Sequence, residues 1–274
     1  MRAMTFTLAV VAWLHTLAFW PTPAFAATIL TYHSFDARSS MSISMAAFAA
    51  QLDYLQRSGH TVISMDELVR DVEAGRNPPD KAVVIAIDDG WGSVMKAFAE
   101  LKRRDLPFTL FLPMGYVANP GVGATLSQAD IDELKAYPKV TFANHSFSHS
   151  KRLTRDMVFA REDIRKSVER FRRVIGHDTP YFAYPYGARN QTYTDMLGAS
   201  GFKYLFVTGS QPVSARTRPA AIPRIAAHHL SVSMLASILR DHDVMMARIK
   251  PAPEANERLV SATPPAEAIP RNVE

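Results

Sequence analysis

Two adjacent carboxylates follow an apolar run in the stretch VVIAIDDGWGS, residues 83–93. The apolar run is typical of a buried strand, and Asp88 and Asp89 come at its end. Neighbouring like charges repel, and removing carboxylates from water costs free energy unless a cation compensates them. The pair therefore indicates either a solvated turn or a site built around a cation.

A pair of histidines follows another apolar strand-like stretch. His145 and His149 lie four residues apart in NHSFSH, a spacing that puts both imidazoles on one side of a helical turn or compact loop. One carboxylate of the aspartate pair would complete a His, His, Asp set with positions open for water and substrate. Taken singly, DDG also fits a turn, and HxxxH also fits two histidines without a ligand. Their joint occurrence at strand ends favours a catalytic metal site.

Short apolar runs alternate with helical patterns along the chain, which predicts parallel β/α units. The predicted strands are 28–34, 60–64, 81–87, 108–113, 139–146, 180–185 and 203–208. The predicted helices are 45–59, 65–75, 93–104, one opening at Ser127, a long one ending at Ile175, and 191–199. About seven such units indicate an α/β fold with a closed or nearly closed barrel. Active sites of such folds lie at the carboxyl ends of the strands, where the aspartates and histidines are found.

Composition is that of one large globular domain. The chain has 274 residues, of which 47% are hydrophobic, and a formal net charge of +5. The basic residues are scattered or, in 161–173, interleaved with acids, so nucleic acid is not expected as a partner.

The two ends of the chain differ from the middle. Residues 1–26 carry Arg2, an apolar run and a final Ala-Phe-Ala, which predicts a secretory signal cleaved before Ala27; an uncleaved membrane anchor is the alternative. Residues 27–249 are then the catalytic domain. Residues 250–274, rich in Pro, Ala and Glu, are expected to be a disordered tail. Since the chain has no cysteine, disulfides cannot stabilise it in the expected location, the periplasm or cell surface.

Three motifs, AIDDG, HSFSH and FAYPYG, together resemble the first three motifs of the polysaccharide deacetylase family (NodB homology, carbohydrate esterase family 4), and the resemblance runs from about residue 28 to 225. Members remove acetyl groups from N-acetylated or O-acetylated sugars. The resemblance implies a distorted (β/α)7-8 barrel that binds a divalent metal, usually zinc (Zn2+), through Asp89, His145 and His149. It also implies Asp88 as the general base. The tyrosine of FAYPYG, Tyr186, which follows Pro185, would donate its backbone N–H to the oxyanion.

Departures from the family pattern indicate one branch of it. Ala183 stands where most members have an arginine that braces the base, and the Asp-Trp and Leu-x-His motifs are not recognisable. LTYHSF and IPRI instead resemble the branch that deacetylates poly-β-1,6-N-acetylglucosamine during biofilm polysaccharide export. In that branch the acid histidine comes from the first strand. The resemblance therefore assigns the general acid to His33 and the bracing of Asp88 to Arg224.

Some residues keep two interpretations. His228 and His229 compete with His33 for the acid role, because they lie nearer the usual C-terminal position. The alternative for His33 is a strand-end histidine with a structural hydrogen bond. Trp91 is either a platform for a sugar ring or a core aromatic residue.

The sequence thus predicts an exported, metal-dependent polysaccharide N-deacetylase that acts on N-acetylglucosamine units of a poly-β-1,6 type polymer. Its expected partners are the polysaccharide and polysaccharide-export machinery, with membrane contact only through export or an uncleaved signal. Within the enzyme class, the alternatives are a peptidoglycan or chitooligosaccharide deacetylase and an O-acetyl esterase. The alternative from another class is a catalytically silent sugar-binding barrel, against which the complete set of base, ligands and acid argues.

Overall fold

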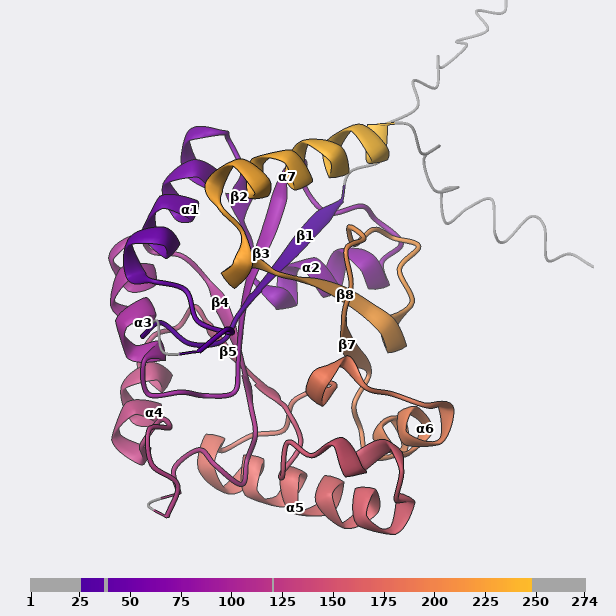
Figure 1. Ribbon diagram of the computed structural model, residues 1–274. Coiled ribbons are helices and arrows are strands. Elements are labelled where there is room, and N and C mark those ends of the chain that lie inside the picture. Colours follow the sequence, from indigo (N-terminus) through magenta and orange to yellow (C-terminus); the bar gives the residue numbers. More distant parts are fainter. Residues whose placement is uncertain (1–25, 37–38, 120, 248–274) are drawn as a thin grey trace, which may run out of the picture.

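The computed structural model describes residues 26–36, 39–119 and 121–247. Strands occupy the middle of the molecule and helices surround them (Figure 1). The strands are β1 (Ala27–Tyr32), β2 (Thr61–Val62), β3 (Ala82–Asp88), β4 (Phe108–Leu112), β5 (Val140–Asn144), β6 (Tyr181–Ala183), β7 (Tyr204–Thr208) and β8 (Ile222–Ala226). The helices are α1 (Met45–Arg57), α2 (Met65–Glu73), α3 (Val94–Arg103), α4 (Gln128–Lys135), α5 (Met157–Ile175), α6 (Gln191–Ala199) and α7 (Val232–Ala247). The predicted signal segment, apart from its last residue, and the predicted tail lie outside the described residues.

The sheet closes on itself as a parallel barrel. Its order is β1, β8, β7, β6, β5, β4, β3, and β1 also pairs with β3 in parallel over six residue pairs, from Ala27 with Ala82 to Tyr32 with Ile87. The predicted (β/α)7-8 barrel is therefore confirmed, with β1 and β3–β8 forming the ring. β2 pairs with the first residues of β3, outside this ring.

Two elements were not among those predicted from the sequence, and several strands, such as β2, β5 and β6, are shorter than predicted. β8 and α7 complete the chain after β7. Pro223 inside β8 obscures its strand pattern, because proline is ordinarily a signal against a strand. The predicted strand 60–64 contracts to Thr61 and Val62. Closure of the barrel depends on β8, which pairs with both β7 and β1.

Alternation along β3 explains where its carboxylate lies. Val83, Ile85 and Ile87 pack in the outer cluster beneath the helices, whereas Ala82, Val84 and Ala86 pack in a second cluster inside the barrel. Successive side chains of a strand point to opposite faces, so Asp88 continues the inner row. Because β3 is buried on both faces, its sequence is continuously apolar and does not reveal this alternation.

Helix α2 fills the amino-terminal end of the barrel. Its Met65, Leu68 and Val69 pack into the same inner cluster as the strand residues, and in Figure 1 α2 lies across the ring of strands. Ser64 caps the helix by accepting a hydrogen bond from the Glu67 N–H. With this end filled, the opposite end, where the strands finish, is left for a pocket.

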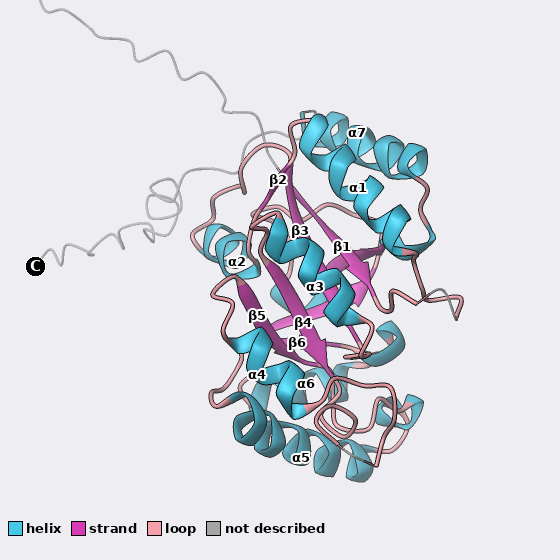
Figure 2. Ribbon diagram, turned by 90° about the vertical axis from the view of Figure 1, so that its left-hand side faces the viewer, coloured by secondary structure: helices cyan, strands magenta, loops and turns pink. Residues whose placement is uncertain are grey.

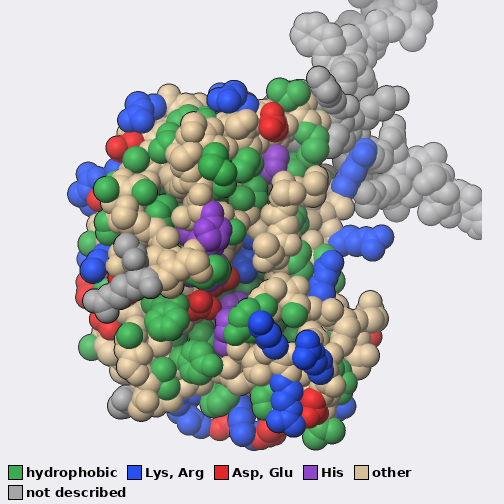
Figure 3. All heavy atoms as spheres, in the orientation of Figure 1, with side chains coloured by type: hydrophobic (Ala, Val, Ile, Leu, Met, Phe, Trp, Pro, Cys, Tyr) green, Lys and Arg blue, Asp and Glu red, His purple; other side chains and the backbone are tan. Residues whose placement is uncertain are grey.

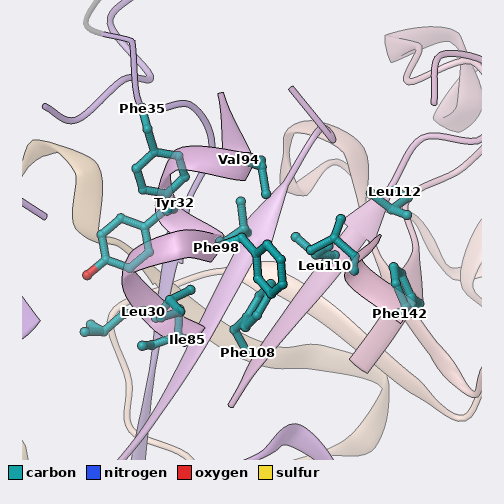
Figure 4. Close-up of a cluster of buried hydrophobic side chains, with 14 of the residues drawn as sticks. Leu30, Tyr32, Phe35, Ile85, Val94, Phe98, Phe108, Leu110, Leu112 and Phe142 are labelled. Carbon is teal, nitrogen blue, oxygen red and sulfur yellow. The ribbon is translucent and has the colours of Figure 1, made fainter. Parts of the chain in front are cut away.

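The outer helices bury an aromatic-rich layer against the barrel. Helices α1, α3 and α4 lie along one side of the strands (Figure 2), and Figure 4 shows aromatic and aliphatic side chains filling the space between. Phe98 of α3, for example, packs edge-on against Tyr137 with ring centroids 5.7 Å apart. Among the described helices, none is both long and apolar enough to cross a membrane.

Candidate active site and metal centre

A pocket of about 300 Å³ opens at the carboxyl ends of the barrel strands. In Figure 3, histidine and acidic side chains gather near the centre of the face that looks down the barrel. The pocket is lined by most of the residues that the sequence singled out: His33, Asp88, Asp89, His145, His149, Tyr186, Arg224, His228 and His229. The tertiary structure therefore brings together residues that are up to about 196 positions apart (His229 minus His33).

Asp89, His145 and His149 form a compact group of donor atoms. Asp89 Oδ1 lies 3.6 Å from His145 Nε2 and 3.3 Å from His149 Nε2, and one donor atom from each residue lies within 4.8 Å of the others. Nitrogen and carboxylate oxygen ligands bind zinc at about 2.0–2.2 Å, so ligands of one ion lie about 3–4 Å apart. The group has the composition and size of a divalent-cation site.

The hydrogen bond of His145 fixes which of its nitrogens faces this site. Its Nδ1 lies 2.7 Å from the carbonyl oxygen of Ala183, which can only accept, so Nδ1 carries the proton and Nε2 keeps a lone pair. Burial lowers the pKa of His145 to about 3 and also lowers that of His149. Both imidazoles are therefore neutral at pH 7, the form that binds a metal.

Asp89 sits on a strained turn just after β3. Its φ is 70°, which turns its side chain away from the direction that a continuing strand would give it. Burial, and then the charge of neighbouring Asp88, raise its pKa. Within the described part of the chain, Oδ1 is buried and has no hydrogen-bond donor. A cation at this position would satisfy that oxygen and stabilise the carboxylate charge, so the residues fit a divalent metal.

Asp88 has a different environment from its neighbour. Its two carboxylate oxygens accept hydrogen bonds from the two terminal nitrogens of Arg224, at 2.7 and 2.8 Å. Burial alone would raise the pKa of Asp88, but the Arg224 guanidinium, with smaller contributions from His145 and His33, lowers it to about 2. The guanidinium in turn lies over the ring of Phe111, 4.7 Å from its centroid. Arg224 thus occupies the bracing position that the resemblance assigned to it.

The three histidines proposed for the acid role lie in a row. His33 Nε2 is 4.0 Å from Asp88 Oδ2. The ring of His228 packs edge-on against that of His33, with ring centroids 4.9 Å apart. The ring centroids of His228 and His229 are 3.9 Å apart. His33 is therefore the member of the row that borders Asp88, while His229 is exposed to solvent.

Three residues predicted to contact substrate have different positions. Tyr186 lines the pocket; its side chain is exposed, its φ is 59°, and its ring lies 4.6 Å from that of His149. Pro185 is buried and is not part of the pocket lining. Trp91 is 40% exposed, so it is not a core residue; its indole N–H donates to Asp89 Oδ2 at 3.3 Å, and it too lies outside the pocket lining.

The pocket also contains residues that sequence reasoning did not single out. They are Thr31, Met41, Tyr184, Thr208 and Ala226. Gly187, which the sequence places at a strand end with Pro185 and Tyr186, also lines the pocket. Several lie beside recognised residues: Thr31 precedes the strand-end His33 by two positions, and Ala226 follows Arg224 by two. Spacing by two places side chains on the same face of a strand, so a known inward-facing residue could have identified them.

Comparisons with known proteins agree with this geometry. Residues 75–205 match the family model described as polysaccharide deacetylase, a range that includes Asp88 and Asp89 but neither His33 nor Arg224. No curated protein matches. Among solved structures, IcaB from Ammonifex degensii is 28% identical with a TM-score of 0.68, covering 80% of this chain and 98% of its own.

Two further structures share the fold at lower identity. The deacetylase PplD from Streptococcus pyogenes is 21% identical with a TM-score of 0.70, covering 80% of this chain and 99% of its own. The BpsB deacetylase domain from Bordetella bronchiseptica is 17% identical with a TM-score of 0.64, covering 75% of this chain and 97% of its own.

The closed parallel barrel, with its acidic and histidine residues at the strand ends, is a (β/α)7 barrel of the NodB type. More particularly, residues 75–205 match a polysaccharide deacetylase domain, and this match supports polysaccharide deacetylase activity.

Proposed function

We propose that the enzyme is a metal-dependent N-deacetylase of N-acetylglucosamine units in an exported polysaccharide of the poly-β-1,6 type. The main observation in support of this proposal is that the two adjacent carboxylates have different environments. Asp88 is held ionised by Arg224, whereas Asp89 directs toward His145 and His149 an oxygen that has no hydrogen-bond partner in the described part of the chain. Binding a sugar alone requires neither arrangement, so a catalytic role accounts for more of the site.

The metal site would be formed by Asp89, His145 and His149. A divalent cation such as zinc, when bound, lowers the pKa of water from about 15.7 to about 7 and polarises a carbonyl oxygen. That acidification matters because a carboxylate with a pKa of about 2, as in Asp88, is a weak base. Removal of a proton by Asp88 would therefore depend on this lowering of the water pKa.

The remaining steps belong to the residues of the chain. Asp88 accepts a proton from the attacking water while the oxygen of that water bonds to the acetyl carbon. The Tyr186 N–H donates to the developing oxyanion. His33, which lies beside Asp88, gives a proton to the departing nitrogen as the carbon–nitrogen bond breaks, leaving acetate and a free amine.

The N-acetylglucosamine substrate and the β-1,6 linkage rest on the resemblance of LTYHSF and IPRI to one branch of the family. Two structural facts support the assignment: His33 from the first of these motifs and Arg224 from the second both border Asp88.

Acetate release tests this proposal. The purified protein, metal-free and zinc-loaded, would be assayed with β-1,6-linked and β-1,4-linked N-acetylglucosamine oligomers, with an O-acetylated sugar alongside. Zinc-dependent release from the β-1,6 series is expected. Preference for the β-1,4 series would move the substrate to peptidoglycan or chitin, and release only from the O-acetylated sugar would indicate an esterase. No release from any of them, with zinc bound, would favour a silent sugar-binding protein.

We also propose export to the periplasm or cell surface, supported by the signal-like residues 1–26 and the absence of cysteine from the sequence. Ala27 opens β1, and its N–H donates to the Val213 carbonyl at 2.9 Å. Mass spectrometry of the protein recovered from the cell envelope should find Ala27 as the first residue. An intact Met1 would indicate an anchor instead.

A further inference from the structure

The loop that carries the two histidine ligands has an unfavourable backbone. It runs from His145 to His149, and both Ser146 (φ 70°) and His149 (φ 48°) adopt the left-handed region. Residues with a Cβ rarely occupy this region, and they stay there only when surrounding interactions hold them. The geometry of the ligand pair therefore depends on what binds this loop.

Asp163 of α5 binds the middle of the loop. One of its carboxylate oxygens accepts a hydrogen bond from the Phe147 N–H and the other from the Ser148 N–H, each at 2.9 Å. The residue is 4% exposed. A buried carboxylate is costly unless its oxygens are satisfied, and hydrogen bonds to an ionised acceptor are stronger than those between neutral groups. Asp163 thus holds two consecutive peptide groups that lie between the ligands.

A neutral network supports both ends of the same loop. Asn144 Oδ1 accepts from the Ser146 N–H at 2.9 Å and from Ser167 Oγ at 2.6 Å. Ser146 Oγ accepts from the His149 N–H at 2.9 Å. Ser167 lies one helical turn beyond Asp163, so both act from the same face of α5. The helix therefore holds the loop directly through Asp163, and Ser167 holds Asn144, the residue just before the loop.

We propose that Asp163 is a positioning residue that fixes the loop between His145 and His149 in the conformation that binds the metal. This inference rests on the proposed metal site. If the two N–H groups lost their acceptor, the loop could relax from its left-handed residues, and His149 would move relative to Asp89. Residues that orient metal ligands typically change metal affinity about 10–100-fold when they are replaced.

The test compares Asp163→Asn with variants of its neighbour Ile164. Asparagine keeps the size of the side chain but replaces one acceptor oxygen with an NH2 group, which would face a backbone N–H. Ile164 is buried in an apolar cluster on the same helix, and Ile164→Val and Ile164→Ala bracket the loss of stability without removing the loop hydrogen bonds. Urea midpoints identify the Ile164 variant that matches Asp163→Asn.

Zinc affinity and amide exchange are the two readouts. Competition with a chromophoric chelator should show zinc bound at least about tenfold more weakly by Asp163→Asn, and within about twofold of wild type by the matched Ile164 variant. Hydrogen exchange of the metal-free proteins should show faster exchange at Phe147 and Ser148 only in Asp163→Asn.

The outcomes separate this inference from the proposed function. If wild type binds zinc and Asp163→Asn binds it equally well, the positioning role is refuted and the metal site stands. If the matched Ile164 variant loses zinc to the same extent as Asp163→Asn, the effect is one of general stability and the inference also fails. If wild type itself binds no zinc, both the metal site and the inference are overturned.

Discussion

At the scale of single residues, Asp88 and Asp89 are chemically alike but electrostatically opposite. Arg224 lowers the pKa of Asp88 to about 2 against the effect of burial, whereas burial and the Asp88 charge raise that of Asp89. One carboxylate has its cation within the chain, and the other has an oxygen without a hydrogen-bond partner among the described residues. Adjacent identical residues can therefore serve as base and as ligand.

Replacing Asp88 by asparagine should separate catalysis from metal binding. The amide cannot accept the proton of water, so kcat/KM should fall by about 100-fold or more. Zinc affinity should stay within a few-fold of wild type, because the proposed ligands are unchanged. Asp89→Asn is the matched comparison, and it should lose zinc affinity. Activity of Asp88→Asn within tenfold of wild type would remove Asp88 as the base.

Arg224→Met should reverse the effect of pH on the contribution of Asp88 to stability, and it should change the pH dependence of activity. In the wild type, the folded pKa of Asp88, about 2, is below the unfolded value of about 3.9. Asp88 therefore contributes stability above pH 3.9, which is lost as the pH falls toward 2. Without the guanidinium, burial dominates and raises the pKa of Asp88 above its unfolded value. Asp88 would then destabilise the folded protein at neutral pH instead of stabilising it.

The expected loss is about 3–5 kcal/mol of unfolding free energy at pH 7, because a buried carboxylate is left unpaired. The deficit should shrink by pH 4, where protonation relieves it, and the acidic limb of the rate profile should move to higher pH. Urea unfolding at both pH values measures the first effect. Arg103→Met, which breaks an exposed pair with Glu100, should cost little at either pH. An equal deficit for Arg224→Met at pH 7 and pH 4 would contradict the argument.

At the scale of elements, the end of β3 is shaped by its turn. Asp89 and Gly90 both have positive φ, 70° and 65°. Gly90 also has no room for a side chain, since an added Cβ would lie 2.6 Å from Val117 Cγ2. The glycine of DDG is thus required by packing as well as by backbone conformation.

Gly90→Ala should destabilise the protein by about 1–3 kcal/mol and weaken zinc binding, because relieving the clash would displace the neighbouring Asp89. Gly59→Ala is the control: Gly59 has a similar φ of 74°, but nothing lies within 4 Å of an added Cβ. Gly59→Ala should lower the free energy of unfolding by about 1 kcal/mol, the cost of the backbone conformation alone, and should leave zinc affinity unchanged. Urea unfolding and chelator competition measure both variants. Equal effects in the two would show that packing at Gly90 is unimportant.

At the scale of the whole molecule, several histidines are buried as neutral groups. Burial lowers the pKa of His228 to about 4 and lowers those of His60 and His242. His242 of α7 also connects to the barrel, with one ring nitrogen 2.8 Å from Thr28 Oγ1 and the other 2.8 Å from the Ser210 carbonyl. The Ser210 carbonyl can only accept, so Nε2 carries the proton of the neutral ring and Nδ1 accepts from Thr28; protonation would require this second bond to reverse its direction.

The metal-free protein should therefore lose stability in mild acid. Histidines in the unfolded chain bind protons near pH 6.5, at a higher pH than the buried histidines of the folded protein. The unfolded state therefore becomes more stable relative to the folded state as the pH falls below about 6.5. Each such histidine contributes up to about 1.4 kcal/mol per pH unit until its folded pKa is reached. Thermal midpoints between pH 7.5 and 4.5 test this. His242→Gln should flatten the profile, whereas a change at the exposed His177 should not. A midpoint that stays constant from pH 7.5 to 5 would contradict it.

The sequence by itself determined the barrel class and most of the pocket. Alternation of apolar runs with helical patterns predicted a closed or nearly closed parallel barrel, and because strand ends of such a barrel meet at one rim, AIDDG and HSFSH could be placed together. Motif resemblance added His33 and Arg224, and both line the pocket. Each of these features depends on a short stretch of sequence, so it can be recognised without the tertiary structure.

The tertiary structure alone decided the features that depend on distant contacts. Strands buried on both faces conceal which residues point inward, so only the fold shows that Thr208 lines the pocket while Pro185 does not. Three other features join residues that are far apart in sequence or lie on different elements. They are the closure of the barrel through β8, the order of the three histidines from Asp88 outward, and the hydrogen bonds of Asp163 to the loop between His145 and His149. No periodic pattern encodes such contacts, because they arise only when the ring of strands closes and the helices pack around it.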